Sequence, residues 1–263
     1  MTKRLLITGA SSGIGRALAQ AYAAEGASLC LMGRDEARLE AAAEACRAAG
    51  AAGVDTAIAD VRDREAMARL IEAAQAERPI DILVANAGVA TGLSPGQVLE
   101  TPEAVRAMMA INVNGVFNTV EPVIAAMCAR GAGQIAIVGS MAGVRSLPYS
   151  PAYCAAKASV HMWAECLRGR LAAHGVAVSL IVPGFVETPM AARTKSWQPG
   201  AISDTKAAEI IKRGLDRRRP VIAFPQYMYY AMRVFALLPS GLVDGVMRRF
   251  HVEVPETSER EAS

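Results

Sequence analysis

The sequence predicts an α/β fold: a single-domain, doubly wound parallel sheet of about seven strands with helices on both faces. Short apolar runs alternate with helix-length segments along the chain, a pattern typical of βαβ units. The apolar runs are continuous rather than alternately apolar and polar, as expected of strands that are covered on both faces. A length of 263 residues suits one large domain, and no repeat or linker divides it.

The predicted elements follow one another in a regular order within one domain over 1–263. The apolar runs are expected to be strands at 4–8, 28–32, 54–60, 81–86, 134–139, 176–182 and 221–224. The longer segments between them are expected to be helices at 13–25, 35–49, 63–77, 102–129, 151–174 and 203–217.

The composition argues against several classes of protein. A net charge of +3, without a basic run interleaved with aromatic residues, argues against nucleic-acid binding. The five cysteines are odd in number and lack C-x-x-C spacing, which indicates reduced thiols in a cytoplasmic protein. No His, Cys or Asp residues have metal-ligand spacing, so no metal site is expected. The N-terminus lacks the long apolar stretch of a secretory signal.

A glycine-rich turn follows the first predicted strand. The segment TGASSGIG over 8–15 places Gly9, Gly13 and Gly15 directly before a predicted helix. Glycines let the backbone turn tightly and approach a pyrophosphate at the N-terminus of that helix. A purely structural turn is the alternative, but the strand before and the helix after favour a bound dinucleotide.

The end of the second strand indicates which dinucleotide binds. An acidic residue here would accept from the ribose 2′-hydroxyl of NAD. Gly33 stands at this position and is followed by Arg34, whose planar guanidinium suits the 2′-phosphate of NADP. Asp35 is expected to cap the next helix instead. NADP(H) is therefore the expected cofactor and NAD(H) the second option. Other nearby basic candidates, expected to be mostly solvated, are Lys3, Arg4, Arg16 and Arg38.

The segment YSPAYCAAKAS over 149–159 places Tyr153 and Lys157 four residues apart. Residues i and i+4 share one face of a helix, so the phenol and the ammonium can converge. A cation about 4 Å away would stabilise the phenolate by roughly 4 kcal/mol at an effective dielectric of about 20, which lowers the tyrosine pKa. The pair is predicted to be an acid/base; an exposed tyrosine beside a solvated lysine is the alternative.

Further motifs occur in a fixed order: ADV at 59–61, NAG at 86–88, NVNG at 112–115, Ser140 at a strand end and PGFVETPM at 183–190. With the turn at 8–15 and the Tyr153/Lys157 pair, the sequence resembles the short-chain dehydrogenase/reductase family over roughly 3–190. The resemblance implies a Rossmann-like fold with a cofactor-binding half over about 1–130 and a catalytic and substrate half over about 131–225. An apolar helical extension follows over about 226–250.

The resemblance also implies roles for individual residues. Tyr153 would be the general acid/base, and Lys157 would lower its pKa and hold the nicotinamide ribose. Ser140 would bind the substrate oxygen, and the backbone carbonyl of Asn112 would hold a water that relays protons to Lys157. The implied cofactor contacts are Gly9, Ser11, Ser12, Gly13, Ile14, Gly15, Arg34, Asp60, Val61, Asn86, Ala87, Gly88, Tyr153, Lys157, Pro183, Gly184, Val186 and Thr188.

The loops after the fourth, fifth and sixth strands are implied to contact the substrate. Their side chains are mostly apolar, with Arg145 the only obvious charge. A hydrophobic ketone or secondary alcohol is therefore expected, rather than a sugar or a small acid. The implied substrate contacts are Ser140, Met141, Tyr149, Phe185, Met190 and Trp197.

Two further expectations concern the oligomeric state and the alternative function. The resemblance implies a homodimer or homotetramer that pairs through the helices at 102–129 and 151–174, where small residues such as Ala158, Ala164 and Gly169 allow close approach. A non-catalytic, NADP-binding regulatory or scaffold protein on the same fold is the alternative function. Retention of all four catalytic residues favours the enzyme.

The segment 226–250 departs from the family pattern. Its first helix, predicted over 226–238, has only Gln226 and Arg233 as polar residues. It is too short to span a bilayer and lies between two prolines. Two alternatives stay open. The helix is buried over the substrate pocket or a partner subunit, or it lies in a membrane interface with Arg233, Arg248 and Arg249 facing anionic head groups. The expected location is the cytoplasm, with membrane association under the second alternative.

Overall fold

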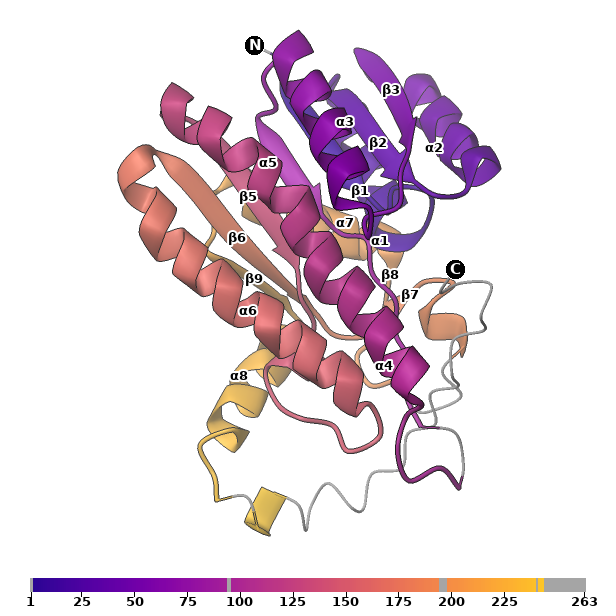
Figure 1. Ribbon diagram of the computed structural model, residues 1–263, viewed down its shortest axis with the longest axis vertical. Helices are drawn as coiled ribbons and strands as arrows, with labels where there is room; N and C mark the ends of the chain where they lie inside the picture. The colour runs from indigo at the N-terminus through magenta and orange to yellow at the C-terminus, as the bar shows by residue number, and fades with distance from the viewer. Residues whose placement is uncertain (1, 94–95, 194–197, 240, 244–263) are drawn as a thin grey trace.

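A seven-stranded parallel sheet forms the centre of the computed structural model, which describes residues 2–93, 96–193, 198–239 and 241–243 (Figure 1). The strand order is β3-β2-β1-β4-β5-β6-β9, so the chain reverses direction across the sheet between β1 and β4 as in other doubly wound folds. The strands are β1 (Arg4–Thr8), β2 (Ser28–Gly33), β3 (Gly53–Ile58), β4 (Ile82–Ala85), β5 (Gly133–Val138), β6 (Val176–Pro183) and β9 (Val221–Phe224).

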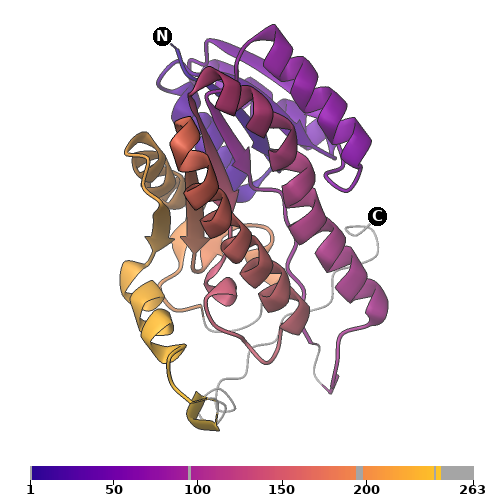
Figure 2. The same cartoon turned by 60° about the vertical axis from the view of Figure 1, so that its left-hand side comes forward.

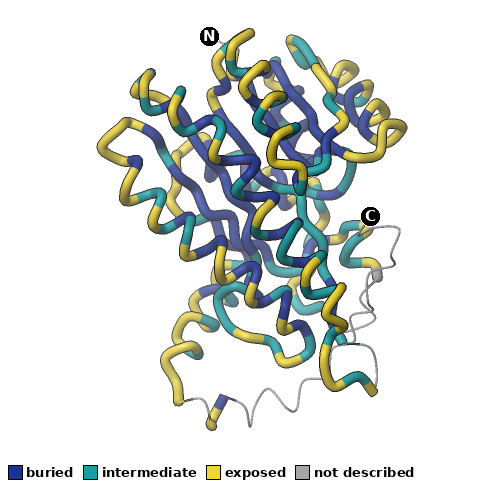
Figure 3. Tube along the Cα trace, viewed as in Figure 1, coloured by how far each residue is buried: buried dark blue, intermediate teal, exposed yellow. Residues whose placement is uncertain are grey.

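Helices cover both faces of the sheet, which confirms the predicted fold class. One apolar core lies against α1 (Gly13–Ala23), α2 (Glu36–Ala48) and α7 (Asp204–Asp216). A second core lies on the other face, against α3 (Arg64–Glu77), α5 (Gly115–Arg130) and α6 (Pro151–Leu171). Figure 3 shows the buried sheet between these two layers. Ala164 is buried in the second core, so it is not available for the predicted contact between subunits.

Two predicted elements differ from their sequence patterns. The helix expected over 102–129 is divided into α4 (Pro102–Met109), a π-helical turn over Ala110–Asn114, and α5. Strand β3 is not covered on both faces, because it is an edge strand and Ile58 is 52% exposed. A short parallel pair, β7 (Val186–Glu187) with β8 (Ile202–Ser203), was not expected.

Side-chain caps explain where several helices begin. The Asp35 carboxylate accepts from the backbone N–H of Arg38 at 3.0 Å, which confirms Asp35 as the cap of α2. Asp63, Thr101 and Ser203 cap α3, α4 and α7 in the same way. Helix α1 differs, because its N-cap Ser12 makes no side-chain capping bond. The first amides of α1 are therefore left for another partner.

Beyond β9, helix α8 (Gln226–Phe235) projects from the carboxyl edge of the sheet (Figure 2). Tyr229 packs into the core, whereas Tyr227, Tyr230 and Val234 are each more than 60% exposed. One face of this helix is therefore open in the single chain, and burial of that face would require a partner subunit. Arg248 and Arg249 lie outside the described residues. Among the helices that the structure describes, none is both long and apolar enough to cross a bilayer.

Candidate active site

The glycine turn after β1 has the geometry that a pyrophosphate requires. Gly9 has a φ of +64°, in the left-handed region that favours glycine. A Cβ at Gly15 would lie 2.4 Å from the Gly9 carbonyl oxygen, so only glycine allows this close approach. The turn leads into the N-terminus of α1, where no side chain caps the first amides. Backbone N–H groups at such a helix end bind phosphate.

The NAG segment after β4 braces this turn. The Asn86 amide Nδ2 donates to the carbonyl oxygens of Thr8 at 3.0 Å and Gly9 at 3.1 Å. The Thr8 hydroxyl in return accepts from the backbone N–H groups of Asn86 at 3.1 Å and Ala87 at 3.2 Å. The carboxyl ends of β1 and β4 are therefore held together at the point where the strand order reverses.

Two arginines surround the carboxylate of Asp60, which the resemblance assigns to the cofactor site. Arg62 donates to both Asp60 oxygens, with the shortest contact 2.6 Å, and the Arg34 guanidinium lies 4.0 Å away. Burial acts to raise the pKa of Asp60, but the hydrogen bonds from Arg62 prevail and lower it. Asp60 is thus a carboxylate at neutral pH, and Arg34 lies beside it at the end of β2.

The segment after β6 packs against the glycine turn. A Cβ at Gly13 would lie 3.0 Å from Cγ2 of Thr188, so the two predicted cofactor segments are in contact. The Thr188 hydroxyl accepts from the backbone N–H of Ala191 at 3.2 Å. A hollow of about 390 Å³ opens beside them and is lined by Arg16, Glu187, Thr188, Pro189, Ala191, Ala192, Gln198 and Asp204.

Three side chains on one face of α6 contact the end of β5. Tyr153, Lys157 and His161 stand four residues apart, so they follow one another along the helix. The Ser140 side chain interacts with the Tyr153 hydroxyl, and Lys157 Nζ donates to the Val138 carbonyl oxygen at 2.9 Å. His161 Nε2 accepts from the Ser140 backbone N–H at 3.2 Å. Helix α6 therefore places Ser140 relative to Tyr153.

The pKa of Tyr153 differs from the prediction. Burial raises it, the hydrogen bond with Ser140 lowers it, and the neighbouring Cys154 raises it, so that it lies above its ordinary value. Lys157 is not among these causes. Its Nζ bonds to Val138 and lies 5.8 Å from the centre of the Tyr153 ring. The net shift of the Tyr153 pKa is therefore upward, opposite to the predicted lowering, and burial lowers the pKa of Lys157 itself to about 8.

Asn112 lies within the π-helical turn and is fully buried. Its amide accepts from the backbone N–H of Val89 at 2.9 Å and donates to the Val89 carbonyl oxygen at 2.7 Å. A Cβ at Gly88 would lie 2.8 Å from Asn112 Oδ1 and 3.6 Å from Lys157 Nζ. Asn112, Lys157 and the NAG segment therefore meet. π-Turns inside α-helices are frequent at functional sites.

The predicted substrate residues are only partly gathered at an open surface. Tyr149, Phe185 and Met190 are half-buried. The Tyr149 carbonyl oxygen accepts from the backbone N–H of Leu93 at 2.9 Å, and this bond joins the loops after β4 and β5. Met141 is 6% exposed and packs into the core rather than facing an opening. Trp197 lies outside the described residues.

The remaining predicted cofactor residues lie along the same edge. Ser11, Ser12 and Ile14 are half-buried in the turn and the start of α1. Val61 and Val186 are buried by packing. Pro183 ends β6, and the Gly184 backbone N–H donates to the Phe224 carbonyl oxygen at 2.7 Å. Arg4, one of the basic candidates, is buried and donates to the Ala74 and Arg78 carbonyls at the end of α3, away from this edge.

Sequence reasoning missed several partners of these residues. His161 was given no role from the sequence alone, although its position four residues after Lys157 continues the Tyr153/Lys157 spacing. Glu100 was also missed; its carboxylate accepts from the backbone N–H of Ala152 at 2.9 Å and so fixes the start of α6. In the part of the chain that the structure describes, no group of three His, Cys, Asp or Glu side chains is placed to bind a metal ion.

Comparisons with known proteins agree with this arrangement. Residues 3–199 match the profile of the family described as short chain dehydrogenase. Galactitol 2-dehydrogenase (L-tagatose-forming) of Cereibacter sphaeroides is 42% identical over 187 residues, which cover 70% of this chain and 71% of the relative.

Two solved structures share the fold and were determined with different cofactors. A short-chain dehydrogenase from Sphingobium yanoikuyae in complex with NADPH is 29% identical, with a TM-score of 0.78 over 95% of this chain and 96% of that one. A short chain dehydrogenase/reductase from Burkholderia phymatum in complex with NAD is 28% identical, with a TM-score of 0.79 over 88% and 92%. The match to the family profile covers most of the chain, and the fold agrees with it. The chain therefore belongs to the short-chain dehydrogenase/reductase family and is an oxidoreductase of the type that acts on CH–OH groups.

Proposed function

We propose that this protein is an NADP(H)-dependent oxidoreductase that transfers hydride between the nicotinamide and a hydrophobic ketone or secondary alcohol. The observation that carries this proposal is that the Tyr153 hydroxyl and the Ser140 side chain interact at the end of β5, with Lys157 on the next turn of the same helix bonded to Val138 there. Two hydroxyl groups at one point are suited to bind and protonate a carbonyl oxygen.

The proton transfer is assigned to Tyr153. Its hydroxyl donates a proton to the substrate oxygen during reduction and accepts one during oxidation. The Ser140 hydroxyl donates a hydrogen bond to the same oxygen and stabilises the charge that develops there. The bound cofactor supplies or accepts the hydride.

Lys157 and Asn112 are assigned supporting roles. Lys157 is 4% exposed, and its pKa of about 8 leaves it mainly charged at pH 7. Its ammonium is proposed to hold the ribose hydroxyls of the cofactor and, once the cofactor is bound, to lower the pKa of Tyr153. Asn112 fixes the loop after β4 through Val89, and its backbone carbonyl is proposed to hold a relay water for Lys157.

The residues at the carboxyl edge fit a dinucleotide. The glycine turn and the uncapped start of α1 suit the pyrophosphate, and Thr188 lies directly against that turn. Gly33 removes the acidic residue that would select NAD, and Arg34 supplies a phosphate partner. A 2′-phosphate would compete with Asp60 for Arg34, since their charged groups are 4.0 Å apart.

The first test concerns the reaction. Tyr153→Phe is expected to lower kcat by about 10² to 10⁴-fold, the range for general acid catalysis, because the lost hydroxyl acts on the substrate oxygen. The dissociation constant for NADPH, measured by titration calorimetry, is expected to stay within about three-fold. Tyr22→Phe, which removes a hydroxyl from α1 on the opposite face of the sheet from α6, is the control and is expected to keep kcat. If Tyr153→Phe keeps most of its kcat, another residue is the acid.

The second test concerns the cofactor. Wild type is expected to have the higher kcat/KM with NADPH, and Gly33→Asp is expected to reverse the preference by more than about ten-fold, because a carboxylate repels the 2′-phosphate. A side chain fits there, since a Cβ at Gly33 would lie 3.4 Å from Leu39 and 3.5 Å from Ser11. Gly33→Ala is the matched control and is expected to keep the wild-type ratio. Equal use of both cofactors by wild type would overturn the NADP assignment.

The substrate class is tested with a panel of ketones. Half-buried Tyr149, Phe185 and Met190 support a hydrophobic substrate. The 42% identity with a galactitol 2-dehydrogenase favours a polyol as a second candidate, so galactitol and L-tagatose belong in the panel. Turnover of lipophilic and cyclic ketones well above that of L-tagatose is the expected result. NADPH binding without turnover of any carbonyl would instead support the non-catalytic alternative.

A further inference from the structure

Helix α8 exposes an apolar face to solvent. Tyr227, Tyr230 and Val234 recur at intervals of three or four residues and are 67%, 63% and 64% exposed, and Leu237 in the turn after the helix continues the spacing and is 85% exposed. The opposite face, with Tyr229 and Met232, packs against the core. Exposed apolar groups that recur along one side of a helix form a continuous patch, which soluble monomers seldom leave uncovered.

The chain segment that carries this face has only positively charged side chains. The stretch 217–243 contains four arginines, at 217–219 and 233, and no Asp or Glu. Asp216, immediately before it, is bound by Lys3 at 2.6 Å and Lys212 at 2.8 Å. The segment that leaves α7, forms β9 and becomes α8 is therefore both cationic and apolar.

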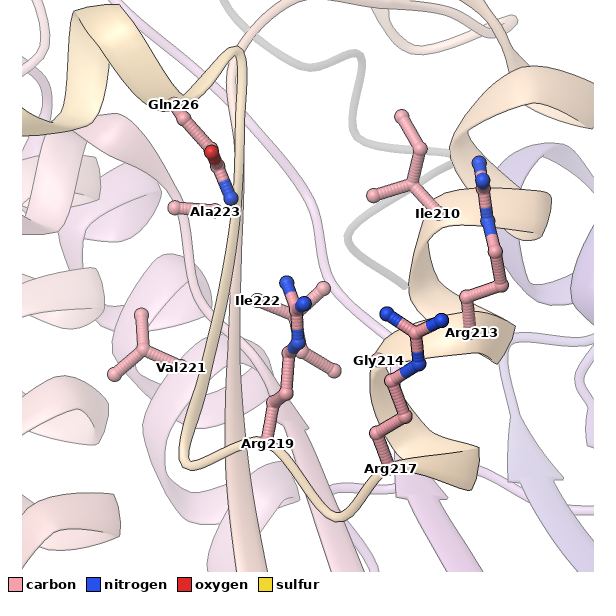
Figure 4. A pocket seen from close by; sticks show the side chains of 9 residues that line it. All are labelled: Ile210, Arg213, Gly214, Arg217, Arg219, Val221, Ile222, Ala223 and Gln226. Carbon is pink, nitrogen blue, oxygen red and sulfur yellow. The ribbon is translucent and has the colours of Figure 1, made fainter.

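Arg217 and Arg219 share one hollow of about 180 Å³ between α7 and β9 with the start of α8 (Figure 4). Arg213, Arg217 and Arg219 extend toward this hollow, and Gln226, the first residue of α8, lines its other end. Guanidinium groups bind phosphate oxygens in a bidentate manner. The arrangement offers phosphate-binding groups next to an apolar helix.

We propose that this surface, formed by the arginines at 217–219 and the exposed apolar side chains of α8, docks on an anionic lipid bilayer. Tyrosines with an apolar ring and a polar hydroxyl suit the interface of a bilayer. Arginines nearby bind the lipid phosphates, as in other amphipathic interfacial helices. A second copy of the chain fits less well, because a two-fold contact would place the arginine cluster against itself, with no carboxylate in the segment 217–243 to compensate.

Docking would bring the active site close to the lipid. Pro225 lies against the segment after β6, where a Cβ at Gly184 would be 3.0 Å from Pro225 Cδ. A Cβ at Gly200 would be 3.0 Å from the Tyr227 hydroxyl. Resting on the proposed function, we infer that the substrate is a lipophilic ketone or alcohol dissolved in the bilayer, which enters from the side of α8.

The test is co-sedimentation of the full chain with vesicles of phosphatidylcholine, alone or with about a third phosphatidylglycerol. Wild type is expected to partition at least about ten-fold more strongly to the anionic vesicles and to be released by high salt. Arg217→Glu/Arg219→Glu is expected to lower this partitioning more than ten-fold, since one basic residue near an anionic surface contributes roughly five-fold. Tyr230→Ser/Val234→Ser is expected to lower it similarly.

The control is Arg47→Glu/Arg69→Glu, which changes as much charge on exposed residues of α2 and α3 and is expected to bind like wild type. All variants are expected to keep kcat with a water-soluble ketone. Absence of anionic vesicle binding, or equal binding by every variant, would overturn the proposal. So would a fall in molar mass of the surface variants without any change in vesicle binding, which would assign the surface to a second copy.

Two further outcomes distinguish lipid docking from catalysis. If a chain that ends at Val243 binds vesicles and the full chain does not, residues 244–263 cover the surface and the proposal is wrong for the whole protein. If wild type binds vesicles but reduces no ketone, docking stands and the proposed function fails. Loss of activity toward a long-chain ketone embedded in vesicles, only in the surface variants, would support delivery from the bilayer.

Discussion

At the scale of single residues, the site depends on how α6 holds the end of β5. Tyr153, Lys157 and His161 contact this strand end at three successive points, through the Ser140 side chain, Val138 and the Ser140 backbone. Because all three side chains contact the same strand end, a substitution of any one of them is expected to shift the other two. His161 is the one without a role in the proposed proton transfer, so it tests whether positioning matters.

His161 is predicted to be a positioning residue for Ser140. His161→Leu leaves the Ser140 N–H without its acceptor, and we expect kcat to fall about ten-fold, equivalent to roughly 1.4 kcal/mol, within the range for an unsatisfied donor. KM for NADPH is expected to stay constant. His161→Gln can supply an acceptor near the position of Nε2 and is expected to restore most of kcat. Equal kcat in both variants would contradict the role.

The same residue predicts a pH dependence of stability. Burial, with a smaller contribution from Lys157, lowers the pKa of His161 from 6.5 to about 4. The unfolded chain therefore binds this proton more tightly, and stability falls as pH falls from 6.5 toward 4. The loss is roughly 3 kcal/mol at most, at about 1.36 kcal/mol per pKa unit. Urea unfolding at about pH 7 and pH 4.5 is expected to show a smaller difference for His161→Gln than for wild type.

At the scale of elements, the π-helical turn between α4 and α5 is what places Asn112 against the loop after β4. Asn112→Leu would leave both the N–H and the C=O of Val89 without their Asn112 partner. Each buried unsatisfied group costs about 1–3 kcal/mol, so we expect a loss of roughly 2–4 kcal/mol in unfolding free energy. Faster hydrogen exchange at Val89 would locate the effect. Asn114→Leu, an exposed change in the same turn, is the control and is expected to be nearly neutral.

Most elements could be predicted from the sequence because their apolar runs are long and uninterrupted. The π-turn could not be predicted, because helical periodicity continues through AINVN. Contacts with the rest of the fold, and not the local sequence pattern, decide where a π-turn forms. The hydrogen bond from Lys157 to Val138 could not be predicted either. Spacing along a helix indicates on which side of the helix a side chain lies, but it does not indicate which group of a neighbouring element accepts its hydrogen bond. For α8, composition showed an apolar helix but not which side would remain open.

At the scale of the whole molecule, α6 carries an exposed stripe suited to a second copy. The stripe residues alternate at spacings of four and three, are small except for one methionine, and are all exposed: Ala155, Ser159, Met162, Cys166 and Gly169. Such spacing forms a seam along which two helices pack. We predict a homodimer, or a tetramer built from it, that uses this stripe.

Met162→Glu places a charge in the middle of the stripe. It is expected to convert a dimer into monomers, which halves the molar mass, or to break a tetramer into smaller species. Light scattering at micromolar concentration measures it, and Arg38→Glu on α2 serves as the control. A monomeric wild type would refute the prediction, and an unchanged mass for Met162→Glu would show that the subunits meet elsewhere.

The strand order also determines what the chain exposes while it is being made. β1 is a central strand, yet the residues that cover its second edge belong to β4 and are paired with Leu5, Leu6 and Ile7. A ribosome that has released the chain only through α3 has therefore produced a half-sheet in which a wholly buried strand of the finished protein is open along one side. Unpaired strand edges recruit other chains or chaperones. The same reversal at the predicted cofactor site thus leaves the nascent chain with an open strand edge until residues 82–84 emerge.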